Sequence, residues 1–304
     1  MNSSAPVDPQ ILPTMGRRCG SCTRVLGRID RKKNGGWFVT CSNCRPEEER
    51  FKETLEHLRV GKCTVEDWIL LSTRLQATLP AAEVESFKDA LRIYSTKSEV
   101  YRYNMKRLRD MEIPVLKIAA SHDGQNAALA AKADTQEAGN LQQYFFVGIG
   151  CQVMLTENVW SDRDLMNGSM GTVYNIVWDA GVEDPRNTPP LAILVHFPKY
   201  NGPPFTEIDG KPVVPIFRQT TEWSKRGTLL RRTQFPLVLA YAITVHKSQG
   251  LTVEKAMLNI NSETDFTPGL NYVTASRVKS LNGLIFEECF DLQRLQRKDE
   301  HDNC

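Results

Sequence analysis

The chain has 304 residues, which is long enough for two or three domains and a substantial core. Lysine and arginine number 38 against 36 aspartates and glutamates, so a uniformly basic or acidic protein is excluded and any nucleic-acid footprint must be local. No apolar run approaches membrane-spanning length, and the amino terminus lacks a basic segment followed by an apolar one, so we expect an intracellular protein.

Residues 1–18 are rich in Ser, Pro and small side chains, and we expect a flexible arm there. Two Cys-x-x-Cys pairs follow, separated by eighteen residues. In a reducing compartment such cysteines are better interpreted as metal ligands than as disulfides, and two pairs complete the tetrahedron that zinc accepts. The spacing predicts a zinc ribbon over residues 19–46, with Zn²⁺ held by Cys19, Cys22, Cys41 and Cys44.

Residues 17–33, which run into the ribbon's spacer, and residues 218–232 are the two locally basic stretches. Arg28, Arg31 and Lys32 in the spacer either contact phosphate or form a solvated face of the ribbon. The sequence leaves both alternatives open.

Helical periodicity begins at Glu47, with Gly61 placed to end the helix. Thr64-x-x-Asp67 predicts a capping box that opens a second helix, and a third is expected from Ala81. The apolar faces of the three helices are Phe51, Leu55 and Leu58, then Trp68, Leu71 and Leu75, then Val84, Phe87 and Leu91. Three arginines, Arg59, Arg74 and Arg92, are interpreted as charges on solvated faces.

A short strand and cap over residues 93–96 precede a helix with Val100, Asn104 and Leu108 on one face. The next predicted elements are a strand over 115–119, a polar surface loop with partial helix over 120–140 and a buried strand over 152–156. Residues 167–232 then alternate short apolar strands with turns rich in Gly, Pro and Asn. This pattern predicts a small β-barrel inserted between two α/β halves.

A long apolar run over residues 237–245 stops at His246-Lys-Ser-Gln-Gly250 and predicts one buried strand with polar groups at its carboxyl end. A second predicted strand, over 271–275, runs into Ser276-Arg277, and a last strand is expected after residues 281–283. Two strand ends that finish in cationic groups indicate an anionic ligand. Residues 291–304 form a charged tail.

Residues 241–252 and 269–278 resemble motifs V and VI of superfamily 1B DNA helicases. The resemblance continues through residues 150–158 and 167–173 and the Phe51-x-x-x-Leu-x-x-Leu-Arg-x-Gly61 stretch, so it covers about residues 47–290. In this order the motifs are most similar to those of the Pif family, with its RecD-like and Helitron-type relatives.

This resemblance implies an α/β fold of RecA-like, P-loop-helicase type. Residues 91–166 and 235–290 would form the second RecA-like domain, 2A, and residues 167–234 an SH3-like 2B insertion. Residues 47–90 would be closing helices of the first RecA-like domain. The implied activity is that of an ATP-dependent 5′→3′ helicase on single-stranded or forked DNA, with roles in DNA repair, recombination and telomere maintenance. The implied location is the nucleus, with the mitochondrion as the alternative.

The resemblance also implies residue roles. Thr244, His246 and Lys247 would lie near the single-stranded DNA backbone, and Gln249 and Gly250 would couple that contact to the nucleotide. Arg277 would be the catalytic arginine finger, because phosphoryl transfer needs charge neutralisation on phosphate oxygens. The alternatives are a structural ion pair for Arg277, a capping histidine at 246 and a solvated lysine at 247.

No phosphate-binding loop of the form Gly-x-x-x-x-Gly-Lys-Ser/Thr occurs in the 304 residues. The acidic string over residues 299–302 follows a polar stretch rather than an apolar strand, so we do not assign it to magnesium. We therefore expect a C-terminal portion of a helicase, or a degenerate copy, that uses ATP and Mg²⁺ only with a separate ATP-binding half. The apolar faces of the helices over 47–90 would then be exposed or repacked.

Two other functions compete with this one. A non-enzymatic, zinc-containing nucleic-acid-binding protein would hold DNA by phosphate contacts without turnover. A cysteine-dependent hydrolase has weak support, because Cys63, Cys151 and Cys289 are scattered along the chain.

Overall fold

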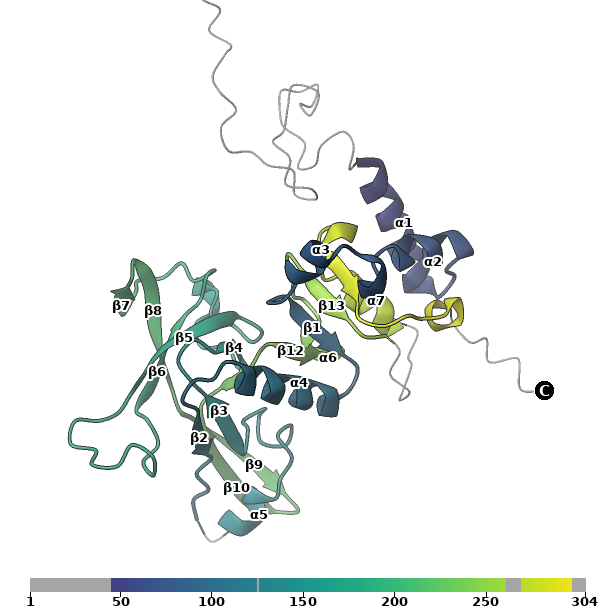
Figure 1. Cartoon of the computed structure of the whole chain (residues 1–304). Helices are drawn as coiled ribbons and strands as arrows, with labels where there is room; N and C mark the ends of the chain where they lie inside the picture. Colours follow the sequence, from purple (N-terminus) through teal and green to yellow (C-terminus); the bar gives the residue numbers. More distant parts are fainter. Residues whose placement is uncertain (1–44, 125, 261–268, 297–304) are drawn as a thin grey trace, which may run out of the picture. The chain divides into compact units, whose positions relative to one another are not determined.

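A computed structural model of the protein describes residues 45–124, 126–260 and 269–296 (Figure 1). The chain divides into two compact units: Leu91–Leu251 form one, and the segments on either side, up to Ala90 and from Thr252, form the other. None of the helices in these ranges is long and apolar enough to cross a membrane. The predicted arm, the zinc ribbon and the acidic string lie outside the described residues.

The Leu91–Leu251 unit contains two short parallel strands, and a helix follows the first of them. Strand β1 (Leu91–Tyr94) pairs in parallel with β12 (Ala242–Thr244), with Tyr94 opposite Thr244. Helix α4 (Lys97–Asp110) follows β1 and begins in a capping box between Thr96 and Glu99. The predicted order of strand, cap and helix is confirmed here.

The same unit contains a six-stranded antiparallel sheet in the order β11-β4-β5-β6-β8-β7. Its strands are β4 (Gln152–Leu155), β5 (Met170–Val177), β6 (Ala192–His196), β7 (Thr206–Ile208), β8 (Lys211–Phe217) and β11 (Leu237–Leu239). The unit is completed by the β2–β3 pair (Leu116–Ala119 and Tyr144–Val147), the β9–β10 hairpin (Gln219–Lys225 and Thr228–Gln234) and α5 (Ala127–Ala131). The β structure predicted after Asn167 is present, and its sheet extends to β4 and β11 on either side.

A glycine permits the close approach of β5 to β6. A Cβ atom on Gly171 would lie 2.7 Å from the carbonyl oxygen of His196 and 2.7 Å from Cγ1 of Val195. Real Cβ atoms do not approach this closely, so the last glycine of the Asn-Gly-Ser-Met-Gly stretch is required by strand packing.

The prediction of one long strand over residues 237–245 is wrong. The run divides into β11, antiparallel to β4, and β12, parallel to β1. At the break, the buried amide of Asn104 on α4 accepts a hydrogen bond from the backbone nitrogen of Ala242 at 2.8 Å and donates to the carbonyls of Ala242 and Leu239 at 3.0 and 3.3 Å. One side chain thus satisfies backbone groups where the chain leaves one sheet for the other.

The second unit contains helices from both ends of the described chain. Its elements are α1 (Arg45–Val60), α2 (Val65–Ser72), α3 (Ala81–Glu85), β13 (Ala256–Leu258), α7 (Gly269–Ala275) and β14 (Leu284–Phe286), with short 3₁₀ turns between several of them. Helix α1 ends before Gly61, which has φ 69°, and α2 begins in the capping box of Thr64 and Asp67, so both predictions are confirmed. Strands β13 and β14 pair in parallel.

The apolar faces of α1 and α2 and the segment after α3 are repacked rather than exposed. Phe51, Leu58 and Leu71 are buried, and Phe87 packs against Met257 of β13 and Ile285 of β14. Of the two outcomes expected for these faces, burial is the one observed.

The motif-bearing strand predicted over residues 271–275 is instead the helix α7. Its buried positions, Asn271, Thr274 and Ala275, recur at helical spacing, but two of them are polar, so the sequence shows no apolar period. The hydroxyl of Thr274 donates to the carbonyl of Leu270 at 3.0 Å, a local bond that a threonine makes within a helix. The predicted second strand end with a cationic group is therefore absent.

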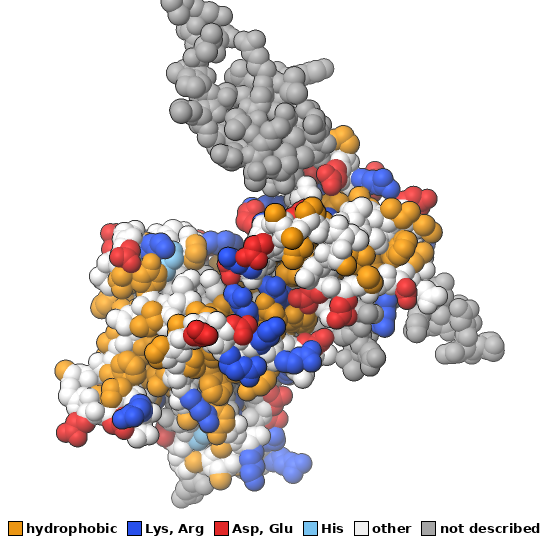
Figure 2. Space-filling view, viewed as in Figure 1, with side chains coloured by type: hydrophobic (Ala, Val, Ile, Leu, Met, Phe, Trp, Pro, Cys, Tyr) orange, Lys and Arg blue, Asp and Glu red, His pale blue; other side chains and the backbone are white. Residues whose placement is uncertain are grey.

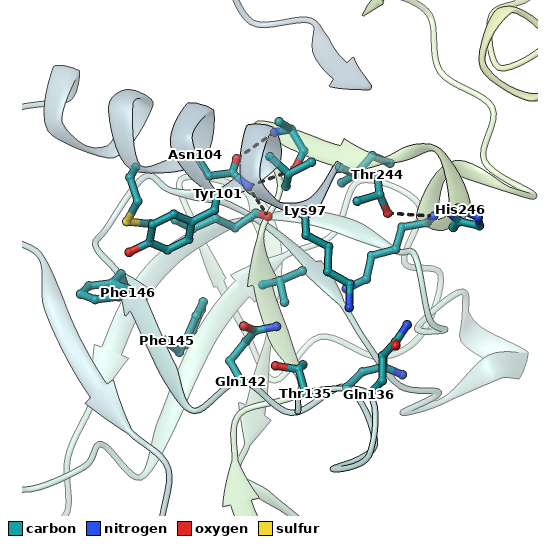
Figure 3. Close-up of a pocket in the computed structure, with 18 of the residues that line it drawn as sticks. Lys97, Tyr101, Asn104, Thr135, Gln136, Gln142, Phe145, Phe146, Thr244 and His246 are labelled. Atoms are coloured by element: carbon teal, nitrogen blue, oxygen red, sulfur yellow. Dashed lines mark hydrogen bonds between the residues drawn. The ribbon is translucent and has the colours of Figure 1, made fainter. Parts of the chain in front are cut away.

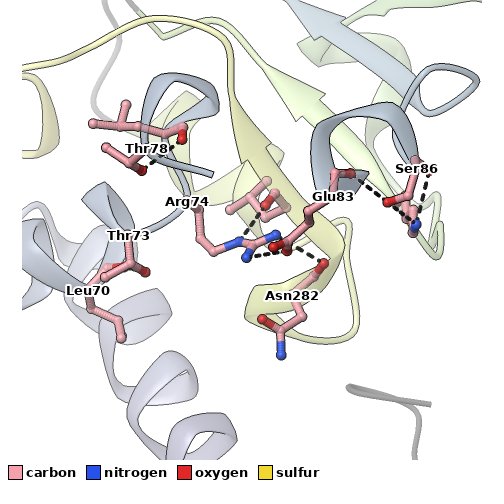
Figure 4. A network of polar contacts seen from close by, with 10 residues as sticks. Leu70, Thr73, Arg74, Thr78, Glu83, Ser86 and Asn282 are labelled. Atoms are coloured by element: carbon pink, nitrogen blue, oxygen red, sulfur yellow. Dashed lines mark hydrogen bonds and ion pairs between the residues drawn. The ribbon is translucent and has the colours of Figure 1, made fainter. Parts of the chain in front are cut away.

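Arg74, which the sequence placed on a solvated face, is buried (Figure 4). Its guanidinium forms an ion pair with Glu83 at 2.7 Å and donates to the carbonyls of Leu284 at 2.9 Å and Asn282 at 3.4 Å. Arg74 therefore links the α2 region to the backbone entering β14, and its charge is balanced inside the protein.

Candidate functional site

The stretch after β12 forms one short helical turn, α6 (Val245–Ser248). Thr244 caps it, because its hydroxyl accepts from the backbone nitrogen of Lys247 at 3.4 Å. His246 and Lys247 are exposed at this turn, while Val245 and Ser248 face the interior. Polar groups do follow the carboxyl end of the strand as predicted, on a helical turn rather than on an extended loop.

A second cationic group stands at the neighbouring strand end, and the sequence reading missed it. Strands β1 and β12 are parallel and in register, so the residues after Tyr94 and after Thr244 leave the same edge. Lys97 begins α4 just beyond β1. The rule that ligands bind at the carboxyl ends of parallel strands would have indicated it, had it been applied to the short strand before Thr96.

Both strand ends border a pocket of about 730 Å³, within the range typical of ligand sites (Figure 3). Figure 3 shows Lys97 extending from α4 towards the opposite wall, where Thr135, Gln136 and Gln142 lie. Aromatic side chains close one end and the residues after β12 the other. The lining contains cationic residues (Lys97, His246, Lys247), one acidic residue (Asp134), aromatic residues (Tyr101, Tyr144, Phe145, Phe146), amides (Asn104, Gln136, Asn140, Gln142) and apolar residues that include Val100, Met105, Val238 and Leu239.

At the cationic end of the pocket, two lysines and a histidine face a single lining carboxylate, Asp134, so the negative charge compensates the positive charge only in part. Partial desolvation beside the pocket lowers the pKa of Lys247 although the residue is exposed, and the like charge of Lys97 lowers this pKa further. Lys97 has Asp134 at 3.9 Å, a long ion pair between exposed side chains, and Lys247 makes no ion pair with any described residue. Two ammonium groups that repel one another at a pocket's edge favour an anionic ligand.

Figure 2 shows Lys and Arg side chains gathered over α4. The exposed faces of Arg102, Lys106 and Arg109 contribute to this charge. These basic side chains lie on the helix that also contributes Tyr101, Asn104 and Met105 to the pocket.

Gln249 and Gly250, predicted to couple DNA to nucleotide, follow directly after α6. Gln249 is the C-cap of the turn and is exposed, and Gly250 has φ 80°, a conformation that favours glycine. Neither residue is among those that line the pocket.

Arg277 lies in the other unit, two residues beyond the end of α7. Its Nε donates to the carbonyl of Val273 at 2.7 Å, and its Nη2 donates to the hydroxyl of Ser276 at 2.8 Å. The side chain is half-buried. Local hydrogen bonds thus hold the guanidinium against the carboxyl end of α7.

Three of the five cations in the basic stretch 218–232 are engaged within the protein. Arg232 is fully buried and donates to the carbonyls of Ala130, Ala133 and Leu141, and burial lowers its pKa. Two further cations of the hairpin are paired: Arg231 with Glu222 at 2.6 Å and Lys225 with Glu137 at 2.8 Å. Arg232, Arg231 and Lys225 therefore have structural partners.

The described cysteines do not belong to a metal site, and the two buried ones, Cys63 and Cys151, are poor nucleophiles. Among the described residues, no group of three or more His, Cys, Asp or Glu side chains is placed to hold a metal ion. Burial and the charge of Asp67 raise the pKa of Cys63 to about 12, and burial raises the pKa of Cys151. Both thiols therefore stay protonated at neutral pH, which argues against the hydrolase alternative.

No family model matches the chain. The human ATP-dependent DNA helicase PIF1 is 30% identical over 240 residues, which are 79% of this chain and 33% of that protein. The Pif1 helicase of Bdellovibrio bacteriovorus is 25% identical over 259 residues, 83% of this chain and 51% of that protein.

Solved structures agree with these matches. The crystal structure of the Candida albicans Pif1 helicase has a TM-score of 0.60 at 24% identity, covering 82% of this chain and 56% of that one. The structure of Bacteroides Pif1 bound to ssDNA has a TM-score of 0.56 at 23% identity, covering 83% and 51%. The chain spans between a third and about half of the length of these curated relatives. Over about four fifths of its own length, the chain is therefore similar in sequence to Pif-family DNA helicases.

Proposed function

We propose that the chain is the DNA-gripping half of an ATP-dependent 5′→3′ DNA helicase. Thr244, His246 and Lys247 bind the backbone of single-stranded or forked DNA at the edge shared by β1 and β12. The observation that carries this proposal is the pair of lysines, Lys97 and Lys247, that meet at one pocket in a relative of the Pif helicases. A phosphate placed there relieves the repulsion between the two ammonium groups.

The nucleotide chemistry is divided between this chain and another segment. The 304 residues hold no phosphate-binding loop, so ATP and Mg²⁺ are bound with a separate ATP-binding half. Arg277 reaches the γ-phosphate as the arginine finger, and Gln249 and Gly250 couple DNA to nucleotide. In this proposal residues 91–166 and 235–290 are the second RecA-like domain, 167–234 its SH3-like insertion and 47–90 closing helices of the first.

The proposed contact with the DNA backbone is tested by binding to fluorescently labelled single-stranded DNA, measured by anisotropy over a range of salt concentrations. We expect salt-sensitive binding that Lys247→Ala weakens equally for all sequences, with the slope of log K against log salt reduced by about 0.7, the value for one phosphate on a single strand. Lys199→Ala removes an exposed positive charge that does not line the pocket and is the matched control. Equal effects of the two substitutions would contradict the assignment.

Hydrolysis of ATP in the presence of single-stranded DNA tests whether the chain needs a separate ATP-binding half. We expect no DNA-stimulated ATPase from the chain by itself. Robust activity that Arg277→Ala abolishes would show that the chain completes a nucleotide site without a second half, and it would overturn this part of the proposal.

The second candidate is a non-enzymatic, zinc-containing nucleic-acid-binding protein, favoured by the spacing of Cys19, Cys22, Cys41 and Cys44. It predicts bound zinc, and single-strand binding that weakens after chelation or after neutralisation of Arg28, Arg31 and Lys32. Unchanged binding after both treatments removes this candidate.

A further inference from the structure

The pocket beside α4 has two chemically different ends. Thr244, His246 and the lysines make one end cationic, whereas Tyr101 and Phe146 lie at the other (Figure 3). Tyr101 is 61% exposed, so its ring offers a free stacking surface, whereas Phe145, which also lines the pocket, belongs to the buried core. A phosphate contact needs only the cationic end, and the aromatic end therefore calls for a separate explanation.

Amide groups line the wall between the two ends. Gln142 is half-buried, and its side-chain amide makes no hydrogen bond within the described part of the chain. Gln136 lies on the same wall and is likewise without a side-chain partner among the described residues. An amide can both donate and accept, which is the pattern that base edges require. Asn104, by contrast, is fully engaged at the strand break and is not available to a ligand.

We propose that this pocket takes one nucleotide of the bound strand, with its phosphate between Lys97 and Lys247 and its base turned into the aromatic end. The base stacks on Tyr101, and Gln142 hydrogen-bonds to its edge. The inference rests on the proposed function and goes beyond it, because a grip on the backbone alone carries no base preference. The volume of about 730 Å³ accommodates a base together with its sugar.

The consequence is a single position of the strand at which the base matters. Stacking on an aromatic ring contributes at each base that it contacts, and loss of one such contact weakens binding by about tenfold. Gln142 adds a preference among bases at that position, of about three- to tenfold for one hydrogen bond. The remaining positions are held by phosphate contacts only.

The test uses the full chain and a series of oligonucleotides of about eight thymidines, the order of one compact binding site, in which a single base is removed at each position in turn. We expect one position where the abasic strand binds about tenfold more weakly than the intact one. Tyr101→Ala should abolish this difference. Phe205→Ala, which removes an aromatic ring that is 67% exposed and does not line the pocket, should preserve it.

Base preference is then measured with the four bases placed at the sensitive position, and Gln142→Ala should bring the four affinities together. Salt-sensitive binding with no sensitive position, or a position whose effect survives Tyr101→Ala, overturns the inference and leaves the proposed backbone grip standing. Absence of any single-strand binding overturns both. A free deoxynucleoside monophosphate that competes as well as the oligonucleotide would show that the pocket serves a soluble nucleotide, which also overturns the inference.

Discussion

Asn104 should be among the most sensitive polar residues of the Leu91–Leu251 unit. It is 6% exposed and makes three hydrogen bonds to the backbone where β11 ends and β12 begins. Asn104→Leu keeps the branched shape of the side chain and leaves no cavity, although its methyl groups are bulkier than the amide, and it leaves the Ala242 N–H and two carbonyls without this partner. With about 1–3 kcal/mol for a buried group left unpaired, partly offset by the added apolar burial, we expect a loss of about 2–4 kcal/mol.

Urea unfolding followed by circular dichroism and tryptophan fluorescence measures this loss. With a slope of about 2–3 kcal/mol/M, the midpoint of the affected transition should fall by about 1 M. Asn126→Leu is the matched control, because Asn126 is exposed and its side chain makes no capping hydrogen bond, so its effect should stay within about 0.5 kcal/mol. Equal midpoints for the two variants would refute the argument, since the backbone at the strand break would then have other partners.

Two further predictions concern the second unit and the sheet. Burial acts to raise the pKa of Asp67, but hydrogen bonds from the Thr64 backbone and from the Thr54, His57 and Thr64 side chains outweigh it and lower this pKa below 3.8. The ionised carboxylate therefore stabilises the fold above pH 3.8, and this contribution is lost as the pH falls through the lowered pKa of the folded state. Asp67→Asn should therefore flatten the acid side of a curve of stability against pH. An unchanged acid side would contradict the assignment. Gly171→Ala should destabilise the sheet by about 1–3 kcal/mol in thermal unfolding, because the added Cβ would clash with the His196 carbonyl. Gly269→Ala is the control, since a Cβ at Gly269 has no neighbouring atom within 4 Å. Equal melting temperatures for the two variants would show that β5 and β6 can separate at this point.

Part of the site was accessible from the sequence because its signals are local. Thr244, His246 and Lys247 lie at the end of an apolar strand or directly after it in the sequence, so their position at its carboxyl end can be predicted from the sequence. Lys97, Tyr101 and Gln142 were not identified, since their shared pocket depends on the parallel pairing of β1 with β12 and on the loop that precedes β3. The roles proposed for Gln249, Gly250 and Arg277 rest on the resemblance.

By itself the sequence determined those features whose interactions span a few residues. Both capping boxes, Thr64 with Asp67 and Thr96 with Glu99, bond within three residues of one another, and Gly61 ends its helix by its own backbone freedom.

Only the tertiary structure decided the features whose partners lie far along the chain. Asn104 bonds to Ala242, 138 residues away, and so divides an apolar run that reads as one strand. Asn271 and Thr274 become a buried helix face because neighbouring segments enclose them, although their polarity conceals the period. Hydrophobic pattern specifies which residues are buried, but the choice of sheet and the burial of polar groups depend on the hydrogen-bond partners that folding brings into reach.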